Sequence, residues 1–259
     1  MYAQPDTLAR QAPQTRPEPA VKRAPVPAST PALPHASRPQ RGMQRHDLAW
    51  LSEQGWRNAV AAALPEHRAA LARWQQHDWP LVVRRRDADA GYDEVCLGIP
   101  LPPDPASGVK VRISLRVHRS HIARTTAPLL LCALPPKLEL AALESLIRPA
   151  ANTAEVTLHV YGSVAMQALT GQRYLTPASD IDLLFYPATM PQLDAGLALL
   201  GAHAHLPLDG EIVFPDGCAV SWKEWQQANA QRSRVLVKDQ HMVRLQEPAQ
   251  LLAMLEQRP

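Results

Sequence analysis

Residues 157–185 constrain the fold of this chain more than any other stretch, because they predict a strand, a tight turn, a helix and a second strand. Residues 157–161 alternate in polarity and are rich in β-branched side chains, as expected of a strand. Gly162 permits a sharp turn, and the residues that follow predict a helix with Ser163 as its N-cap. Free N–H groups and the helix dipole favour an anion at such a point, so Gly162 and Ser163 predict a phosphate site.

Asp180 and Asp182 lie at the start of the next predicted strand, residues 180–185. Side chains alternate across a strand, so the two carboxylates share one face while the apolar residues between them turn to the core. Two neighbouring carboxylates repel each other unless a divalent cation lies between them, and Mg²⁺ binds one or two carboxylates together with phosphate oxygens. The pattern therefore predicts Mg²⁺-assisted transfer of a phosphoryl or nucleotidyl group, with Asp180 and Asp182 as catalytic and metal-binding residues.

The order of these motifs resembles the nucleotidyltransferase superfamily, which includes DNA polymerase β, kanamycin nucleotidyltransferase and small adenylyltransferases. The resemblance implies a polymerase β-like catalytic domain with a mixed sheet. Sixteen residues separate Ser163 from Asp180, and this loop is longer than expected for the superfamily. A plain Gly-Ser turn and two solvated aspartates on an edge strand are the alternative, but the order of the motifs on predicted strand ends favours a site.

The first 42 residues differ in composition from the rest of the chain. They hold nine of the 26 prolines and almost no large apolar residues, so they cannot form a core and are predicted to be disordered. They carry a net charge of +4, which leaves −1 on residues 43–259 because the whole chain carries +3. A near-neutral body argues against a protein dedicated to nucleic acid. The natural start, Met1 or Met43, stays open.

The chain of 259 residues, 46% of them hydrophobic, is long enough for two domains. No apolar run approaches the ~20 residues that span a bilayer, and no signal peptide is visible, so no membrane contact is expected. The cysteines are scattered and lack metal-binding spacing, which favours buried free thiols in a reducing cytoplasm. They are Cys96, Cys132 and Cys218.

The remaining periodicity predicts a mixed α/β protein with an amino-terminal domain over residues 43–135 and a catalytic domain over residues 136–259. Two helices separated by Pro65 are predicted within residues 58–76. Strands are predicted at 81–86, 95–101, 110–117, 206–214, 218–222 and 235–238, and further helices at 137–147, 193–204, 223–233 and 247–256.

The strand at residues 110–117 alternates most clearly, with Lys110, Arg112 and Arg116 on one face and branched apolar residues on the other. Such a cationic face suits a phosphate-rich substrate or an acidic partner protein. The alternative is the ordinary solvated face of an antiparallel sheet.

Further candidate site residues follow the carboxylate pair. A third carboxylate is expected from Glu211 or Asp209, and we favour Glu211 because it leads directly into an apolar run. Cations could bind a triphosphate, although surface solvation explains them equally well. These cations are Lys223, Lys238 and Arg173.

Longer stretches resemble one family in particular. They are HVYGSVAMQALTGQRYLTPASDIDLLF, LDGEIVFPDGCAVSWKEW, VLVK and the opening RHDLAWL. They are similar to malonate decarboxylase holo-[acyl-carrier-protein] synthase, the phosphoribosyl-dephospho-CoA transferase, from about residue 44 to the end. The most specific part is residues 162–185, whose long loop fits this family.

The resemblance implies transfer of the 2′-(5-phosphoribosyl)-3′-dephospho-CoA group from 2′-(5-triphosphoribosyl)-3′-dephospho-CoA to a serine of the malonate decarboxylase acyl-carrier subunit, with release of pyrophosphate. Asp180 and Asp182 match the catalytic carboxylates of the family and would hold Mg²⁺. Gly162 and Ser163 would bind the outgoing phosphates. Glu211, as a third carboxylate, would take the serine proton or share the metal.

Two other functions stay open from the sequence. A small Mg²⁺-dependent adenylyltransferase would modify a protein or small molecule with AMP from ATP, and it would need no carrier protein. A degenerate nucleotidyltransferase fold would serve as a binding module, although such proteins usually lack a metal carboxylate and both aspartates are present here.

Overall fold

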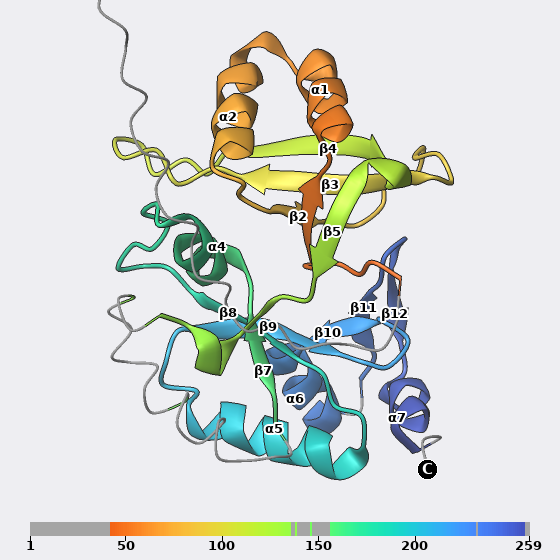
Figure 1. Ribbon diagram of the computed structural model, residues 1–259. Helices are drawn as coiled ribbons and strands as arrows, with labels where there is room; N and C mark the ends of the chain where they lie inside the picture. The colour runs from red at the N-terminus through yellow and green to blue at the C-terminus, as the bar shows by residue number, and fades with distance from the viewer. Residues whose placement is uncertain (1–41, 136–137, 139–145, 147–155, 232, 257–259) are drawn as a thin grey trace, which may run out of the picture. The chain divides into compact units, whose positions relative to one another are not determined.

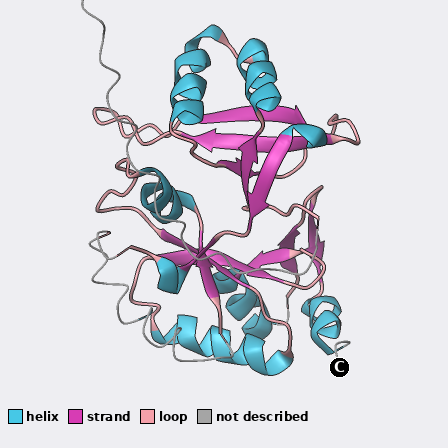
Figure 2. Ribbon diagram, viewed as in Figure 1, coloured by secondary structure: helices cyan, strands magenta, loops and turns pink. Residues whose placement is uncertain are grey.

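The computed structural model describes residues 42–135, 138, 146, 156–231 and 233–256. These residues form two β-sheets with helices packed against them (Figure 1), and both sheets lie in one compact unit. Figure 2 shows how helices and strands are mixed in each half. The prediction of a mixed α/β protein is therefore confirmed.

The first sheet is antiparallel throughout, with the strand order β4-β3-β2-β1-β5. Its strands are β1 (Leu48–Leu51), β2 (Leu81–Val83), β3 (Glu94–Pro100), β4 (Arg112–His118) and β5 (Ile122–Thr126). The predicted alternation of β4 is confirmed, because its residues are exposed and buried in turn. The buried apolar face of β4 begins at Ile113 and not at Val109, because Val109 and Val111 are 57% and 41% exposed.

Helices α1 (Glu53–Ala62) and α2 (Pro65–Gln76) lie together beside this sheet. The Ser52 hydroxyl caps α1 by accepting the Gly55 N–H at 3.2 Å. Pro65 is the first residue of α2, where the missing N–H costs no helical hydrogen bond. The predicted break at Pro65 is confirmed. Three buried tryptophans help to fill the core: Trp56, Trp74 and Trp79.

The second sheet has the order β12-β11-β10-β9-β8-β7-β6. Its strands are β6 (Leu129–Leu130), β7 (Leu158–Val160), β8 (Ile181–Phe185), β9 (Leu208–Val213), β10 (Ala219–Ser221), β11 (Val235–Lys238) and β12 (Val243–Gln246). Neighbours are antiparallel except β8 and β9, which are parallel. Helix α5 (Met190–Ala202) supplies the crossover that a parallel pair requires.

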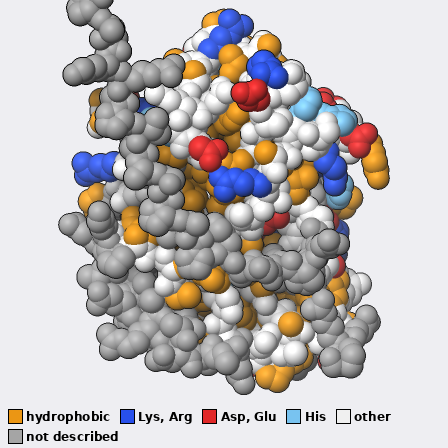
Figure 3. Space-filling model, in the orientation of Figure 1, with side chains coloured by type: hydrophobic (Ala, Val, Ile, Leu, Met, Phe, Trp, Pro, Cys, Tyr) orange, Lys and Arg blue, Asp and Glu red, His pale blue; other side chains and the backbone are white. Residues whose placement is uncertain are grey.

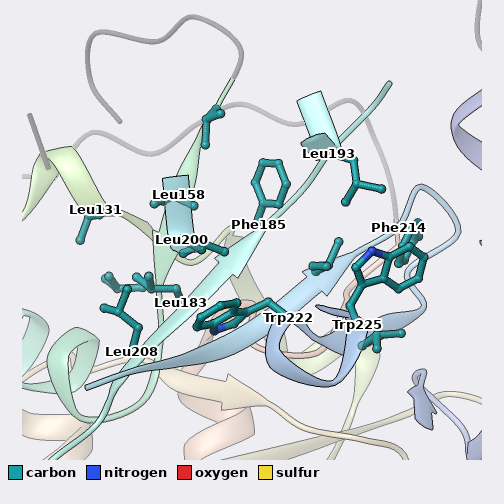
Figure 4. Close-up of a cluster of buried hydrophobic side chains, with 14 of the residues drawn as sticks. Leu131, Leu158, Leu183, Phe185, Leu193, Leu200, Leu208, Phe214, Trp222 and Trp225 are labelled. Atoms are coloured by element: carbon teal, nitrogen blue, oxygen red, sulfur yellow. The ribbon is translucent and has the colours of Figure 1, made fainter. Parts of the chain in front are cut away.

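The main core of the second sheet lies between its strands and the helices α5, α6 (Trp222–Gln231) and α7 (Pro248–Glu256). Figure 4 shows this packing for Leu183, Phe185 and Trp225, among others. The packing is close, because a Cβ at Gly196 of α5 would lie 2.3 Å from the Phe185 ring. The side chains of β8 and β9 that alternate with these apolar residues point to the other face of the sheet.

Helix α4 (Gly162–Thr170) takes part in both cores. Val164 and Ala165 pack in the core of the second sheet, whereas Met166 packs in that of the first. Tyr174, in the loop after α4, also joins the first core, and its hydroxyl donates to the Pro100 carbonyl at 2.7 Å. Contacts to both sheets therefore hold the start of α4 in place.

Some elements differ from the sequence-based expectations. Helix α4 begins at Gly162, with Tyr161 as its N-cap, and not after an N-cap at Ser163. Trp222 begins α6 and does not end the preceding strand. The sequence does not predict β1, β5, β6 or β12, because these strands are short or carry little apolar alternation. The pairs β1–β5 and β6–β7 join segments distant in the chain, whereas β12 forms a hairpin with β11.

Two expectations fall on residues outside the described part of the chain: the disorder of residues 1–42, of which only residue 42 is described, and most of the helix at residues 137–147. The domain boundary at residues 135–136 stays a prediction. Sheet membership changes earlier, between the end of β5 at Thr126 and the start of β6 at Leu129.

All three cysteines are free thiols; Cys96 and Cys218 are buried, as expected, whereas Cys132 is exposed. No described helix is long and apolar enough to cross a membrane. The cytoplasmic location inferred from the cysteines stays a prediction.

Gly210 permits the close approach of β8 and β9. It has a φ of +145°, and a Cβ there would lie 2.0 Å from the Leu183 carbonyl oxygen. Gly210→Ala is therefore expected to lower the free energy of unfolding by about 3 kcal/mol, because the strands must move apart.

Gly171→Ala is the matched control, because Gly171 also has a positive φ, +67°, but nothing within 4 Å of the added Cβ. Its backbone strain alone is expected to cost about 1 kcal/mol. Urea denaturation of both variants measures the difference, and equal losses would contradict a steric role for Gly210.

Candidate active site

Asp182 lies on β8 with its side chain on the face opposite the main core. Its neighbours Ile181 and Leu183 belong to that core, so alternation turns Asp182 the other way. In the parallel pairing of β8 and β9, Asp182 lies opposite Asp209. Asp180 precedes β8 by one residue and is exposed. The structure thus brings the predicted pair together with Asp209.

The Gly162 turn lies directly against the Asp182 carboxylate. Gly162 has a φ of +64°, and a Cβ at this position would lie 2.0 Å from Asp182 Oδ2. The backbone also joins the two segments, because the Tyr161 N–H donates to the Asp182 carbonyl at 3.1 Å. Only glycine provides both the conformation and the space at this point.

The first turn of α4 offers a place for an anion beside this carboxylate. Its N-cap, Tyr161, makes no side-chain capping hydrogen bond, so the first N–H groups of the helix have no side-chain acceptor at that position. The Ser163 hydroxyl lies in the same turn and accepts from Lys110 Nζ at 3.4 Å. Helix N–H groups, the helix dipole and a nearby ammonium all favour a phosphate here.

Burial and the neighbouring carboxylates raise the pKa of Asp182, and two nearby cations oppose them. Burial, followed by the charges of Asp209 and Asp180, raises its pKa from the ordinary 3.8 to about 6, while Lys110 and Arg112 partly oppose the rise. The carboxylates thus repel each other, as like charges in one site do. The two cations that reduce this repulsion come from the segment 110–112, at the start of β4.

The carboxylates fit a divalent cation that is shared with a phosphorylated ligand. Within the described part of the chain, no group of three or more His, Cys, Asp or Glu side chains could hold a metal ion by itself. Mg²⁺ bound together with substrate phosphates needs only one or two protein carboxylates. The repulsion that raises the pKa of Asp182 is what such a cation would relieve, and Mg²⁺ stays a prediction.

Glu211, the favoured third carboxylate, lies in a separate ionic cluster. It is 5% exposed and forms ion pairs with Arg45 and Lys238, each at 3.1 Å. Burial acts to raise its pKa, but the hydrogen bond with His46 and the nearby positive charges outweigh burial and hold the pKa well below its usual range. The structure does not place Glu211 with Asp180 and Asp182.

His46 extends this cluster toward the Gly162 turn. Its ring packs against the Tyr161 ring at a tilt of 47° with a centroid distance of 4.2 Å, and its Nε2 lies 3.2 Å from Arg45 Nη2. Burial lowers the pKa of His46, and the nearby Glu211 carboxylate partly opposes this shift. Sequence reasoning gave little weight to Arg45 and His46, and the only signal for them was their place in the RHDLAWL stretch.

A cavity of about 1300 Å³ joins these features. Gly162, Tyr161 and Asp182 line it from the second sheet, and Arg112 lines it from the first. Lys238 also reaches this cavity, as a predicted phosphate ligand would, although it is already paired with Glu211.

Two predicted cations lie away from the cavity lining. Lys223 is exposed on α6, with its Nζ 5.8 Å from the centre of the Trp222 ring. Arg173 is exposed in the loop after α4. Neither lines the cavity, and a role for either in phosphate binding stays a prediction.

The fold and the site define a mixed α/β protein in which a carboxylate pair faces a glycine turn and a helix N-terminus across a cation-lined cavity. Two family models match the chain: the phosphoribosyl-dephospho-CoA transferase MdcG N-terminal domain over residues 44–128 and the corresponding C-terminal domain over residues 128–249. The chain therefore belongs to the phosphoribosyl-dephospho-CoA transferase MdcG family.

Individual relatives agree with this assignment. A phosphoribosyl-dephospho-CoA transferase of Xanthomonas axonopodis pv. citri is 40% identical over 208 residues, which cover 78% of this chain and 92% of the relative. One of Bradyrhizobium diazoefficiens is 37% identical over 213 residues, covering 79% and 88%. No solved structure matches the chain.

Asp182→Asn is expected to stabilise the protein at high pH. The pKa of Asp182 rises from 3.8 to about 6 on folding, so the folded state binds a proton more tightly than the unfolded state and stability falls as pH rises through this range. At pH 8 the variant should gain about 1–2 kcal/mol, less than the ~3 kcal/mol of the full shift because the side chain is partly exposed.

Thermal denaturation at pH 8 and pH 4 without divalent cations measures this effect, which should vanish at pH 4. Asp194→Asn is the control, because Asp194 is an exposed carboxylate on α5. A loss of stability at pH 8 on Asp182→Asn would show that the carboxylate is not under repulsion.

Glu211→Gln distinguishes a structural role from a metal-binding role. The change leaves the charges of Arg45 and Lys238 without their partner and should lower the free energy of unfolding by about 3 kcal/mol. A metal ligand would instead lose Mg²⁺ affinity with little change in stability.

Urea denaturation without metal and a calorimetric Mg²⁺ titration separate these outcomes. Glu53→Gln is the matched control, because the Glu53–Arg57 pair is exposed, at 86% and 61%, and such pairs contribute less than about 1 kcal/mol.

Proposed function

We propose that this protein transfers the 2′-(5-phosphoribosyl)-3′-dephospho-CoA group from 2′-(5-triphosphoribosyl)-3′-dephospho-CoA to a serine of the malonate decarboxylase acyl-carrier subunit and releases pyrophosphate. Family membership supports the donor and the acceptor class. The observation that carries the chemistry is the contact between the Gly162 turn and the Asp182 carboxylate. A phosphate seated on the α4 N-terminus would lie beside the carboxylate pair.

In the proposed reaction, the acceptor serine hydroxyl attacks the α-phosphate of the donor. A bond forms between the serine oxygen and this phosphorus. The bond from the phosphorus to the bridging oxygen of pyrophosphate breaks, and its electron pair leaves with pyrophosphate. The N–H groups at the start of α4 and the Ser163 hydroxyl bind the outgoing phosphates.

The serine proton needs an acceptor, and we propose Asp209 for this role. It lies opposite Asp182 across the β8–β9 pairing and acts electrostatically on it. Glu211 lies one alternation further along β9, with its carboxylate occupied by Arg45 and Lys238. We therefore assign the third carboxylate to Asp209 and a positioning role to Glu211.

Asp180 and Asp182 are the residues that would hold Mg²⁺. When bound, the ion would neutralise charge on the α-phosphate and the leaving group. Asp182 must be ionised for this task, and a pKa of about 6 means that it is ionised above this pH. Protons are therefore expected to compete with Mg²⁺ for Asp182 below about pH 6, so activity at limiting Mg²⁺ should fall there and recover as the Mg²⁺ concentration is raised.

Intact-mass spectrometry tests the proposal directly. The purified apo carrier subunit is incubated with this protein, Mg²⁺ and the triphosphoribosyl-dephospho-CoA donor. The expected result is a mass gain equal to the phosphoribosyl-dephospho-CoA group. Asp180→Asn and Asp182→Asn should lower the rate at least ~100-fold, because both remove a ligand of the ion that stabilises the transition state.

A parallel incubation with ATP in place of the donor tests the adenylyltransferase alternative. A gain of AMP from ATP alone would replace the proposed function with that alternative. No modification with either substrate, by folded wild-type protein, would show that the donor or the acceptor is wrong. Asp194→Asn, on the exposed side of α5, should keep full activity.

A further inference from the structure

The cations that line the cavity differ in whether the protein itself neutralises them. On the face drawn in Figure 3, some basic side chains lie beside acidic ones and others stand apart from them, and the cavity cations show the same difference. Arg116 forms ion pairs with Asp87 at 2.8 Å and with Asp89 at 2.6 Å. Arg84 also pairs with Asp87, so the charges of these arginines are largely compensated.

The remaining paired cations of the cavity serve the fold. Arg45 and Lys238 are bound to Glu211. Arg86 donates to the backbone carbonyls of Glu94 at 2.8 Å and Ala90 at 2.8 Å. These side chains hold segments of the chain together and have few donors left for a ligand.

Arg112, which lines the cavity, and Lys110, which hydrogen-bonds Ser163 at the start of α4, are different. Arg85 also lines the cavity and is exposed, but it is not among the cations that act on Asp182. Among the described residues, neither Lys110 nor Arg112 forms an ion pair with a carboxylate, and Lys110 Nζ donates a hydrogen bond to the Ser163 hydroxyl at 3.4 Å. Both nevertheless act electrostatically on Asp182, where they lower its pKa against the effect of burial. Arg112 and Asp182 line the same cavity. Two uncompensated cations therefore lie within the electrostatic reach of the catalytic carboxylate.

The loop after α4 helps to hold the start of β4, where Arg112 lies. Arg112 pairs with Pro100 across β3 and β4, and the Pro100 carbonyl accepts the Tyr174 hydroxyl at 2.7 Å. Tyr174 belongs to the loop between α4 and β8, and its backbone N–H donates to Gln167 Oε1 of α4 at 2.9 Å. A short chain of hydrogen bonds thus connects the start of β4 to the helix that begins at the Gly162 turn.

The geometry points to a polyphosphate-binding site formed by Lys110 and Arg112 together with the N-terminal turn of α4. The ligand class is the phosphate chain of the donor, and the part bound is the pyrophosphate that leaves. This inference rests on the proposed function for the identity of the donor. Under this inference, the cationic face of β4 binds the phosphate chain of the donor and not an acidic surface of the acceptor protein.

The chemistry suits these residue types. Arginine donates two parallel hydrogen bonds to a phosphate, and lysine adds a compact charge. Negative charge develops on the bridging oxygen as the bond to the α-phosphate breaks, and fixed cations stabilise it without rearrangement. Arg116 lies on the same face of the same strand but is held by Asp87 and Asp89, so it is expected to contribute little.

Calorimetric titration with inorganic pyrophosphate in the presence of Mg²⁺ tests the site without requiring catalysis. Lys110→Gln and Arg112→Gln should each weaken binding at least tenfold, and the double variant should weaken it further. Arg116→Gln is the matched control and should change the affinity less than threefold. Arg112→Lys, which keeps the charge but loses the paired donors, should retain part of the affinity. Thermal denaturation of each variant verifies that it is folded.

Steady-state kinetics supply the second readout. The variants at residues 110 and 112 should raise the KM for the donor, while the KM for the apo carrier stays within twofold of the wild type. If the wild type binds pyrophosphate and the variants do not, but the wild type transfers no group to the carrier, the proposed function is refuted and the pyrophosphate site still stands. The inference would be overturned if the wild type did not bind pyrophosphate or if the double variant still bound it. A rise in the KM for the carrier alone would also overturn it.

Discussion

The close parallel pairing of β8 and β9 is the constraint on which the arrangement of the acidic residues depends. Gly210 lets the two backbones approach, and the pairing sets Asp182 opposite Asp209. The apolar residues that alternate with these carboxylates fill the core against α5, α6 and α7. A shift of one residue would bury the carboxylates and expose the core, so hydrophobic packing fixes where the acids stand.

Electrostatics then ties the two sheets together. Burial and then repulsion by Asp209 and Asp180 raise the pKa of Asp182, and the opposing cations, Lys110 and Arg112, belong to the other half of the chain. A second ionic cluster is neutralised within the protein. Glu211 of β9 forms ion pairs with Arg45, which precedes β1, and with Lys238 of β11. One ionic cluster is satisfied and holds the structure together, whereas the other keeps charge available for a ligand.

The sequence predicts the elements around the candidate site well, because their signals are local. The Gly-Ser turn, the alternating β8 and the break at Pro65 depend on residues near one another in the chain, and the structure shows all three. The choice between Asp209 and Glu211 could not be made from sequence. Both lie on the same face of β9, two residues apart, but Asp209 lies opposite Asp182 whereas Glu211 is paired with Arg45 and Lys238, which come from other parts of the chain.

The long loop after α4 shows why a departure from a motif can be informative. Sixteen residues separate Ser163 from Asp180, and the loop within them carries Tyr174 into the core of the first sheet. Its hydroxyl holds Pro100, the cross-strand partner of Arg112. A short loop between α4 and β8 would have no residue to make this contact. The additional length therefore lets the half of the chain that holds the carboxylates also position a cation from the other half.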